Sequence, residues 1–473
     1  MGSQIFSVKI VDIAFWLGYS FLSILRFLMQ INSDGSSAKK IAVASGAFMG
    51  LAHLLYLKQY IKGAFFALIE LVFLATLPIT CSKIYDLITL GTPKDHLPVK
   101  LRDNSVFMLI DGILFLAIIA VFVVMYIISV KSAKNTYSDY CRTKRFLSQK
   151  ASVEEISGRA FPITALTPCL VMLLVFVIVP LLFSIAVAFT NYSAPKHITP
   201  ANTVDWVGFD SFKELLLGGS KWSAGFARIA VWTLVWAFAA TFTCYFGGLL
   251  VAVKLQESNI KLAPVFRFIF ILPYAVPVVI TMLLWKNLLN GTFGVVNRTL
   301  EALGLLSYTA DGAVKTIPWL GNATLAQVVC ITLNLWAGFG YFMMLSMGTM
   351  TAISKDIYEA ARIDGASSGQ MFRRVTLPLV LYQTMPLIIM SFTHNINNFG
   401  AIYFLTGGSP NVADSTTTFA GGTDILVTWI YKLTITLQKY NYASVIAVLI
   451  FVVLAPFAIY QFKNTKAYKE GAV

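Results

Sequence analysis

The chain has 473 residues, of which 57% are hydrophobic and 12% charged, and its formal net charge is +14. Its mean hydropathy is +0.74. So apolar a composition excludes a water-soluble domain, because the apolar side chains exceed what one core can bury. The five cysteines are scattered and odd in number, which predicts neither a disulfide framework nor a metal site.

Eight apolar segments are long enough to cross a bilayer as helices. They are residues 63–80, 105–130, 162–190, 226–253, 265–286, 323–353, 379–405 and 440–462. Two shorter segments, 10–29 and 41–57, are interrupted by charged or imidazole side chains. They fit an interfacial helix, a re-entrant pair or two further spans, and the sequence does not decide among these. The fold class is therefore an all-α polytopic membrane bundle.

Lysine and arginine concentrate in alternate loops, most densely in residues 131–159. Such a bias marks the cytoplasmic side, so both termini and the charged loop at 354–378 are expected in the cytoplasm of a multi-pass membrane protein. The same distribution argues against a nucleic-acid partner. No cleavable secretory signal is apparent at the N-terminus.

The predicted organisation has two parts. Residues 1–160 form an N-terminal membrane extension of at least two spans that ends in a basic cytoplasmic linker. Residues 161–473 form a six-helix core, with the loop 354–378 between its fourth and fifth spans. The chain has no G-x-x-x-x-G-K-[ST] motif, and no acid–base constellation gathers at one membrane depth. The sequence therefore predicts a protein that is not an enzyme and holds no cofactor.

The loop 354–378 carries Glu359-Ala360-Ala361, then Gly365, and after nine further residues Val375-Thr376-Leu377-Pro378. This spacing resembles the EAA loop of binding-protein-dependent ABC importer permeases, the cytoplasmic element that docks into an ATPase subunit. That family has isoleucine at the position of Val375. The residues expected to couple to the ATPase are Glu359, Ala360, Ala361, Asp364, Gly365, Leu377 and Pro378.

Local chemistry within the loop predicts two short helices. Gly365 permits the turn that ends the first, and Ser367 or Ser368 can cap the second. Pro378 is expected to open the next membrane helix, where its missing N–H costs nothing.

Two core spans carry polar groups near their centres, where hydrocarbon makes them costly. Asn334, Gly338 and Tyr341 share one helix face at spacings of four and three, and Asn395 and Asn398 share another. Amides and aromatic rings suit a neutral sugar, which offers hydroxyls and an apolar ring face. The alternative is that these side chains only join helices to one another.

The resemblance extends over residues 161–468 to the larger, MalF-type permease subunit of maltose/maltodextrin importers. It rests on ILPYAVP (271–277), NLWAGFGYFMMLSMG (334–348), SFTHNINNFGAIYFLTGGSP (391–410) and FAGGTDILVTWIYK (419–432). It implies a permease that translocates a maltodextrin-like oligosaccharide by alternating access. The implied sugar contacts are Asn334, Ala337, Gly338, Tyr341, His394, Asn395 and Asn398.

Three departures qualify the resemblance. The maltose pattern has phenylalanine where this chain has His394 and leucine where it has Ala337, which puts maltose itself in doubt and favours a larger or differently linked oligosaccharide. The outer loop 191–225 is short, although in well-known members it forms a domain that grips the binding protein. The sequence of residues 50–63 is, by contrast, similar to that of family members from single-membrane bacteria.

The partners that the resemblance implies are a second homologous permease, two ATP-binding cassette ATPases and an extracytoplasmic sugar-binding protein. ATP and Mg would then be bound by the partner subunits, and the expected location is the bacterial plasma (inner) membrane, in contact with lipid.

Three other functions stay open. A permease of the same architecture could carry another solute such as glycerol phosphate, although an anion would call for a lysine or arginine at the midplane. A secondary transporter could couple through Glu70 or Asp111, but structural pairing or an interfacial position is the favoured role of these carboxylates. A membrane enzyme is disfavoured, because no acid–base constellation gathers at one membrane depth in this sequence.

Overall fold

The computed structural model describes residues 38–94, 96–143, 158, 161–257, 260–308 and 312–463. These residues form helices and loops, with two isolated β-bridges and no longer strand among them. By internal contacts the chain divides into two compact units. One contains Met1–Ala186 with Pro195–Asp205, and the other contains Val187–Ala194 with Trp206–Val473. The boundary predicted at residue 160 stays a prediction.

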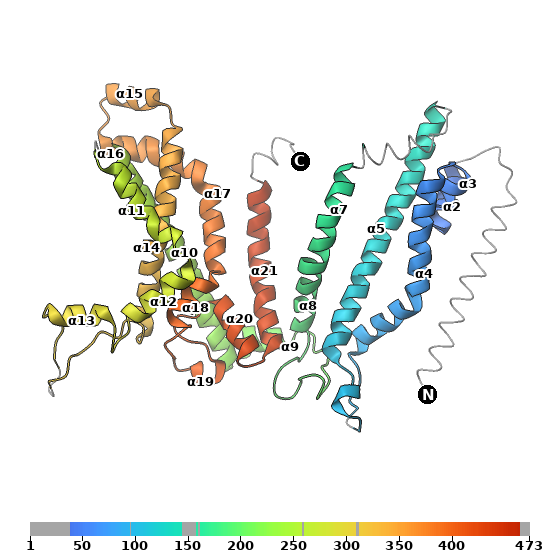
Figure 1. Cartoon of the computed structure of the whole chain (residues 1–473), viewed down its shortest axis with the longest axis horizontal. Coiled ribbons are helices and arrows are strands. Elements are labelled where there is room, and N and C mark those ends of the chain that lie inside the picture. Colours follow the sequence, from blue (N-terminus) through green and yellow to red (C-terminus); the bar gives the residue numbers. More distant parts are fainter. Residues whose placement is uncertain are drawn as a thin grey trace. The chain divides into compact units, whose positions relative to one another are not determined.

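The first unit is built on a pair of long helices joined by a loop (Figure 1). Its elements are α2 Ala38–Ala47, α3 Leu51–Leu55, α4 Tyr60–Thr89, η1 Val99–Leu101, α5 Ser105–Thr143, α7 Phe161–Leu173, the π-helical η2 Leu174–Ile178 and α8 Val179–Ala188, whose last two residues fall in the second unit. Helix α2 packs on α5 and α3 packs on α4.

The short helices α2 and α3 account for the apolar segment 41–57. They contain ten and five residues and are separated by Gly50, whose φ is +79°. At about 1.5 Å per residue, neither can cross a bilayer core of about 30 Å. The segment is therefore a broken helical pair and no single span, while 10–29 lies outside the described residues.

Both carboxylates considered for proton coupling are engaged within this unit. The Asp111 carboxylate pairs with Nζ of Lys83 at 2.7 Å. The buried Glu70 carboxylate accepts a hydrogen bond from the backbone N–H of Met49, at the break between α2 and α3. Both carboxylates thus have the structural pairing that the sequence favoured. Neither is a free carboxylate of the kind that a proton-coupled secondary transporter would need.

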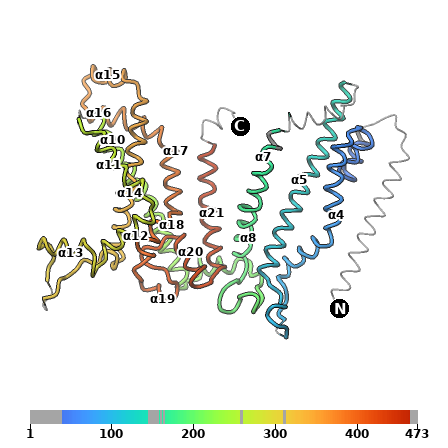
Figure 2. The backbone as a smooth tube through the Cα atoms, viewed as in Figure 1, coloured from blue at the N-terminus to red at the C-terminus, as the bar shows by residue number. Residues whose placement is uncertain are grey.

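The second unit surrounds the long helix α10, which packs against both α14 and α17 (Figures 1 and 2). Its helices are α9 Asp210–Leu217, α10 Lys221–Glu257, α11 Ala263–Ala275, α12 Val278–Leu288, α13 Val295–Ala302, α14 Ala323–Thr351, α15 Lys355–Ile363, α16 Ser368–Met371, the π-helical η3 Phe372–Thr376, α17 Leu377–Ile396, α18 Phe399–Thr406, α19 Ser415–Thr418, α20 Leu426–Ile435 and α21 Tyr440–Lys463.

The predicted spans are found, and two of them are broken. In the described residues, seven helices are long and apolar enough to cross a membrane, and the bent pair α11 and α12 makes up to eight. Those two helices meet at 92°. The span predicted at 379–405 ends as α17 at Ile396 and resumes as α18 at Phe399. Hydropathy located both spans but carries no information about a change of direction inside an apolar run.

Candidate substrate site and coupling surface

The two broken spans meet. Helix α12 packs along α18, and a Cβ placed on Gly400 would lie 3.2 Å from Cγ1 of Val278. Pro277 explains the first break, because it disfavours helical backbone at the preceding residue, and Val276 is extended at φ −83° and ψ 132°. Half-helix ends inside a membrane expose backbone groups that lack helical partners, and transporters use such ends to hold solutes.

At the second break, Asn398 caps the new helix. Its side-chain oxygen accepts a hydrogen bond from the backbone N–H of Ala401 at 3.3 Å, and its Nδ2 donates to Oδ1 of Asn395 at 3.3 Å. Asparagine is a favoured N-cap residue because it satisfies an amide that the first turn leaves free. The side chain of Asn398 remains half-buried.

The Asn395 amide is held by α10. Its Nδ2 donates to Oγ1 of Thr241 at 2.9 Å, and its backbone carbonyl accepts from Nε1 of Trp236 at 3.0 Å. With Oδ1 already bonded to Asn398, the amide is satisfied by the protein, and the side chain is only 5% exposed. In this structure Asn395 joins α17 to α10.

On α14, two of the predicted contacts also face α10. Nδ2 of Asn334 lies 3.5 Å from the carbonyl of Ala240 and 3.4 Å from Sγ of Cys244. A Cβ at Gly338 would come within 3.0 Å of that same sulfur. The missing side chain of Gly338 therefore lets the two helices approach closely, and the sulfur takes the space beside it.

The side chains of the other three predicted residues, Ala337, Tyr341 and His394, are less buried than that of Asn395. The ring of Tyr341 stacks on that of Tyr274 with centroids 5.3 Å apart and stays half-buried, as does Ala337. His394 lies in the last turn of α17 and is exposed. Helix α14 packs against both α17 and α18, so the seven predicted residues lie on neighbouring elements.

Sequence reasoning missed the α10 residues Trp236, Thr241 and Cys244, which fix the asparagines of the two neighbouring helices. Their signal was weak, since threonine, tryptophan and cysteine are ordinary residues in an apolar span. Their role is visible only in the fold, because the asparagines that they bind lie about 90 to 160 positions away in the sequence.

The loop 354–378 forms α15 and α16, at the end of the unit opposite α19 (Figure 1). The side chain of Ser354 caps α15 by accepting the N–H of Asp356. Gly365 turns the chain with φ +76°, and Ser367 caps α16 through a reciprocal capping box with Gln370. The predicted turn at Gly365 is confirmed, and of the two proposed caps Ser367 is the one used.

Helix α15 presents most of its surface to solvent. None of its residues is buried, and Glu359, Ala360 and Ile363 are exposed, Ile363 by 85%. The neighbouring Asp364 and Gly365 are exposed as well. The half-buried Ala361 and Leu377 and the exposed Pro378 complete the predicted set. The arrangement offers an apolar and acidic face on a short helix.

Pro378 does not begin a separate helix. Residues Ser368–Ile396 form one continuous helical stretch in which α17 follows directly on the π-helical η3. A proline within a helix lacks an N–H and crowds the preceding turn, and the wider π turn just before Pro378 relieves that crowding. The expectation that Pro378 opens the membrane helix holds for the α-helical segment only.

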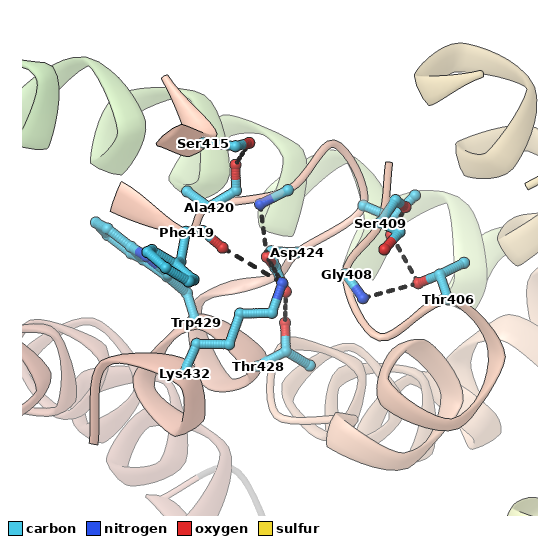
Figure 3. Close-up of polar contacts among 12 residues, drawn as sticks. Thr406, Gly408, Ser409, Ser415, Phe419, Ala420, Asp424, Thr428, Trp429 and Lys432 are labelled. Carbon is cyan, nitrogen blue, oxygen red and sulfur yellow. Dashed lines mark hydrogen bonds and ion pairs between the residues drawn. The ribbon is translucent and has the colours of Figure 1, made fainter. Parts of the chain in front are cut away.

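An ion pair and several hydrogen bonds around Asp424 fix the loop between α18 and α20 (Figure 3). We call this group, which consists of Asp424, Lys432, Gly421 and Thr428, the polar knot. The fully buried Asp424 carboxylate pairs with Nζ of Lys432 at 2.6 Å, and accepts from the N–H of Gly421 and the hydroxyl of Thr428 at 2.7 and 2.8 Å. Gly408 faces the same carboxylate with φ +82°, and any Cβ there would overlap it. The sequence reasoning singled out none of these side chains.

A model of one protein family matches residues 244–463, which include both breaks, the loop 354–378 and the polar knot. The model describes the binding-protein-dependent transport system inner membrane component. The galactooligosaccharides transport system permease protein GanP of Bacillus subtilis (strain 168) is 35% identical over 435 residues, which are 92% of this chain and 99% of GanP. The chain belongs to this family of importer permeases.

Other similar proteins are also components of ABC importers or transport systems. The maltodextrin transport system permease protein MalC of Streptococcus pneumoniae serotype 4 is 33% identical over 444 residues, covering 93% of this chain and 98% of MalC. A chain in the crystal structure of a bacterial alginate ABC transporter, in complex with an alginate pentasaccharide-bound periplasmic protein, matches with a TM-score of 0.51 at 22% identity. It covers 67% of this chain and 98% of that one, and the likeness extends to the fold alone. This importer permease is therefore a MalF-type transmembrane subunit of an ABC importer, a transport subunit and not an enzyme.

Proposed function

We propose that this permease translocates an oligosaccharide by alternating access, and that the sugar is held where α14 meets the break between α17 and α18. The observation that supports the proposal most is the meeting of the two broken spans beside Tyr341, His394 and Asn398. Relatives named for galactooligosaccharides and maltodextrin support a saccharide as the solute. Ala337 and Tyr341 complete the proposed contact surface.

Within this site, Asn334, Gly338 and Asn395 have a double role in the proposal. Their contacts with α10 position the helices, and a movement of α10 away from them would free two amides for sugar hydroxyls. The substrate is neutral in this account, because α14, α17 and α18 contain no lysine or arginine. Arg228 and Lys432 near the outer loop are each engaged with an aspartate, Asp414 and Asp424.

The proposed assembly follows from the exposed α15. Its short apolar and acidic face would dock into one of two ATPase subunits, which bind ATP and Mg. A homologous permease and an extracytoplasmic sugar-binding protein complete the complex. Both termini lie in the cytoplasm in this account, and the location is a bacterial plasma membrane.

The test is ATP-dependent uptake of labelled α-glucans, α-galactosides and β-galactans into proteoliposomes that contain the complete complex. His394→Ala should reduce uptake of the transported class while the complex still hydrolyses ATP. Tyr382→Ala is the matched control, because Tyr382 lies near the other end of α17 and is 83% exposed. Uptake of no saccharide by the wild type would contradict the proposal.

A further inference from the structure

One edge of α17, together with Thr376 at the end of η3, is buried along its length. Its members recur at intervals of four residues and then seven, so they lie on one face of the helix. They are Thr376, Val380, Thr384, Ile388 and Asn395, none more than 5% exposed. The edge runs from the loop that carries α15 to the break beside the proposed sugar site. Three of its five side chains are polar, and each has a partner on another helix.

At the end of this edge nearest α15, the partner is on α15 itself. The Oη atom of Tyr358 lies 3.1 Å from Oγ1 of Thr376, which is 1% exposed. The Tyr358 ring packs with Phe372 against a buried cluster that includes Met350 and Ile353, at the end of α14. No residue of α15 is itself buried, so this half-buried ring and its hydroxyl contribute to holding α15 on the bundle.

The route of the chain gives this hydrogen bond its importance. Between Tyr358 and Thr376 the backbone passes through the turn at Gly365, the four-residue α16 and the π-helical η3. A left-handed glycine turn interrupts the helical backbone, so it transmits movement poorly. The hydrogen bond bypasses this turn and reaches Thr376, the last residue of η3, directly before α17 begins.

Farther along the edge, toward the break, α17 is bonded to α10. The hydroxyl of Thr384 donates to the carbonyl of Val380 at 2.7 Å, so it accepts the hydrogen bond from Oη of Tyr245 at 2.9 Å. Both side chains are fully buried. Asn395 and Thr241 repeat the connection near the break. Buried side-chain hydrogen bonds of this kind are strong and specific because the surroundings are apolar.

We propose that the hydrogen bond between Tyr358 and Thr376 transmits the movement of α15 directly to α17, and that Tyr245 carries it on to α10. Helices α15, α17 and α10 then move together, and the 20 residues of α17, about 30 Å long at about 1.5 Å per residue, deliver the movement to the sugar site. The inference rests on the proposed function, in which an ATPase subunit docks on α15. Tyr358 and Thr376 are positioning residues that touch neither ATP nor sugar.

The test follows the C-terminal end of α17 directly. The exposed cysteines Cys81, Cys141 and Cys169 are replaced by serine, and an environment-sensitive dye is attached at Asn397→Cys, an exposed position at the break. In the complete complex, trapping with ATP and vanadate should change the dye signal. Tyr358→Phe removes one oxygen and keeps the ring, and it should reduce that change at least threefold, with a similar fall in saccharide moved per ATP.

Further variants make the result specific. Thr376→Val should act like Tyr358→Phe, and the double variant should be no worse than either, because both lose the same bond. Tyr382→Phe is the matched control on an exposed tyrosine of α17 and should change nothing. An unchanged dye response in Tyr358→Phe would overturn the proposal, as would loss of the ATPase subunits during its purification, which would make Tyr358 a docking residue.

Failure of the proposed function would look different. If the wild-type dye responds to ATP but no saccharide enters, the substrate proposal fails while the link is still measured by the dye. If the wild-type dye does not respond at all, α17 does not move and the proposed link is wrong.

Discussion

Nδ2 of Asn395 on α17 donates a 2.9 Å hydrogen bond to Oγ1 of Thr241 on α10. Both side chains are buried, at 5% and 0% exposure. The sequence predicts Asn395 as a sugar ligand near the middle of a span. In the structure its amide is already bonded to a neighbouring helix. In the proposed cycle the bond must break for the amide to reach a sugar, so the strength of this contact contributes to the balance between the two states.

Thr241→Val keeps the shape and removes the acceptor, which leaves a buried amide donor without a partner. We expect a loss of about 1–3 kcal/mol in stability, seen as a lower thermal unfolding midpoint of the purified complex. Thr243→Val is the control, because the Thr243 hydroxyl donates to the carbonyl of Ala239 within the same helix α10. Equal midpoints for the two variants would contradict the importance of the bond between helices.

His394→Phe restores the residue that the maltose pattern carries. Because His394 is exposed in the last turn of α17, the change should alter substrate choice more than folding. One altered contact in a binding site is worth about 1–3 kcal/mol, so we expect the ratio of uptake between two saccharide classes to shift by about tenfold or more. A uniform change for all saccharides would remove His394 from the specificity site.

Gly365→Ala tests the turn after α15. The space around Gly365 is open, but its φ of +76° strains any residue with a Cβ by about 1–3 kcal/mol. The variant should lose most of the ATPase stimulation that saccharide-loaded binding protein causes. Gly369→Ala has equally open surroundings without a positive φ and should retain it. Stimulation lost in both variants would point to crowding of the docking surface.

Removing the ion pair of Asp424 and Lys432 tests the polar knot of Figure 3. Lys432→Met leaves a fully buried carboxylate without its cation and should destabilise the protein by about 3–5 kcal/mol. The exposed pair of Lys213 and Asp210 offers a comparison, since Lys213→Met should cost at most about 1 kcal/mol. Thermal unfolding of the purified complexes measures both, and similar losses would refute the role of burial.

Features set by local chemistry could be read from the sequence, while those set by distant contacts could not. Gly365 and Ser367 act through the conformation and capping of their own segment, so their spacing was sufficient. The spans followed from hydropathy, but the break after Ile396 did not, since asparagines suit both an N-cap and a bundle contact. The partnership of Asn395 with Thr241 joins residues 154 positions apart and needed the fold.

The family resemblance identified the two helices of the candidate site, and the structure adds how their residues are held. Ala337, Tyr341, His394 and Asn398 keep side-chain surface free, whereas Asn395 is engaged by α10. In the proposed cycle the engaged residues reach the sugar only in a second state of the bundle, which no pattern within one helix predicts.

The most direct measurement is the structure of the complete complex trapped with vanadate and a transported oligosaccharide. The account predicts sugar density between α14 and the break of α17 and α18, within hydrogen-bond distance of Tyr341, His394 and Asn398. Density bounded by other helices, or held by the partner permease without these residues, would contradict it.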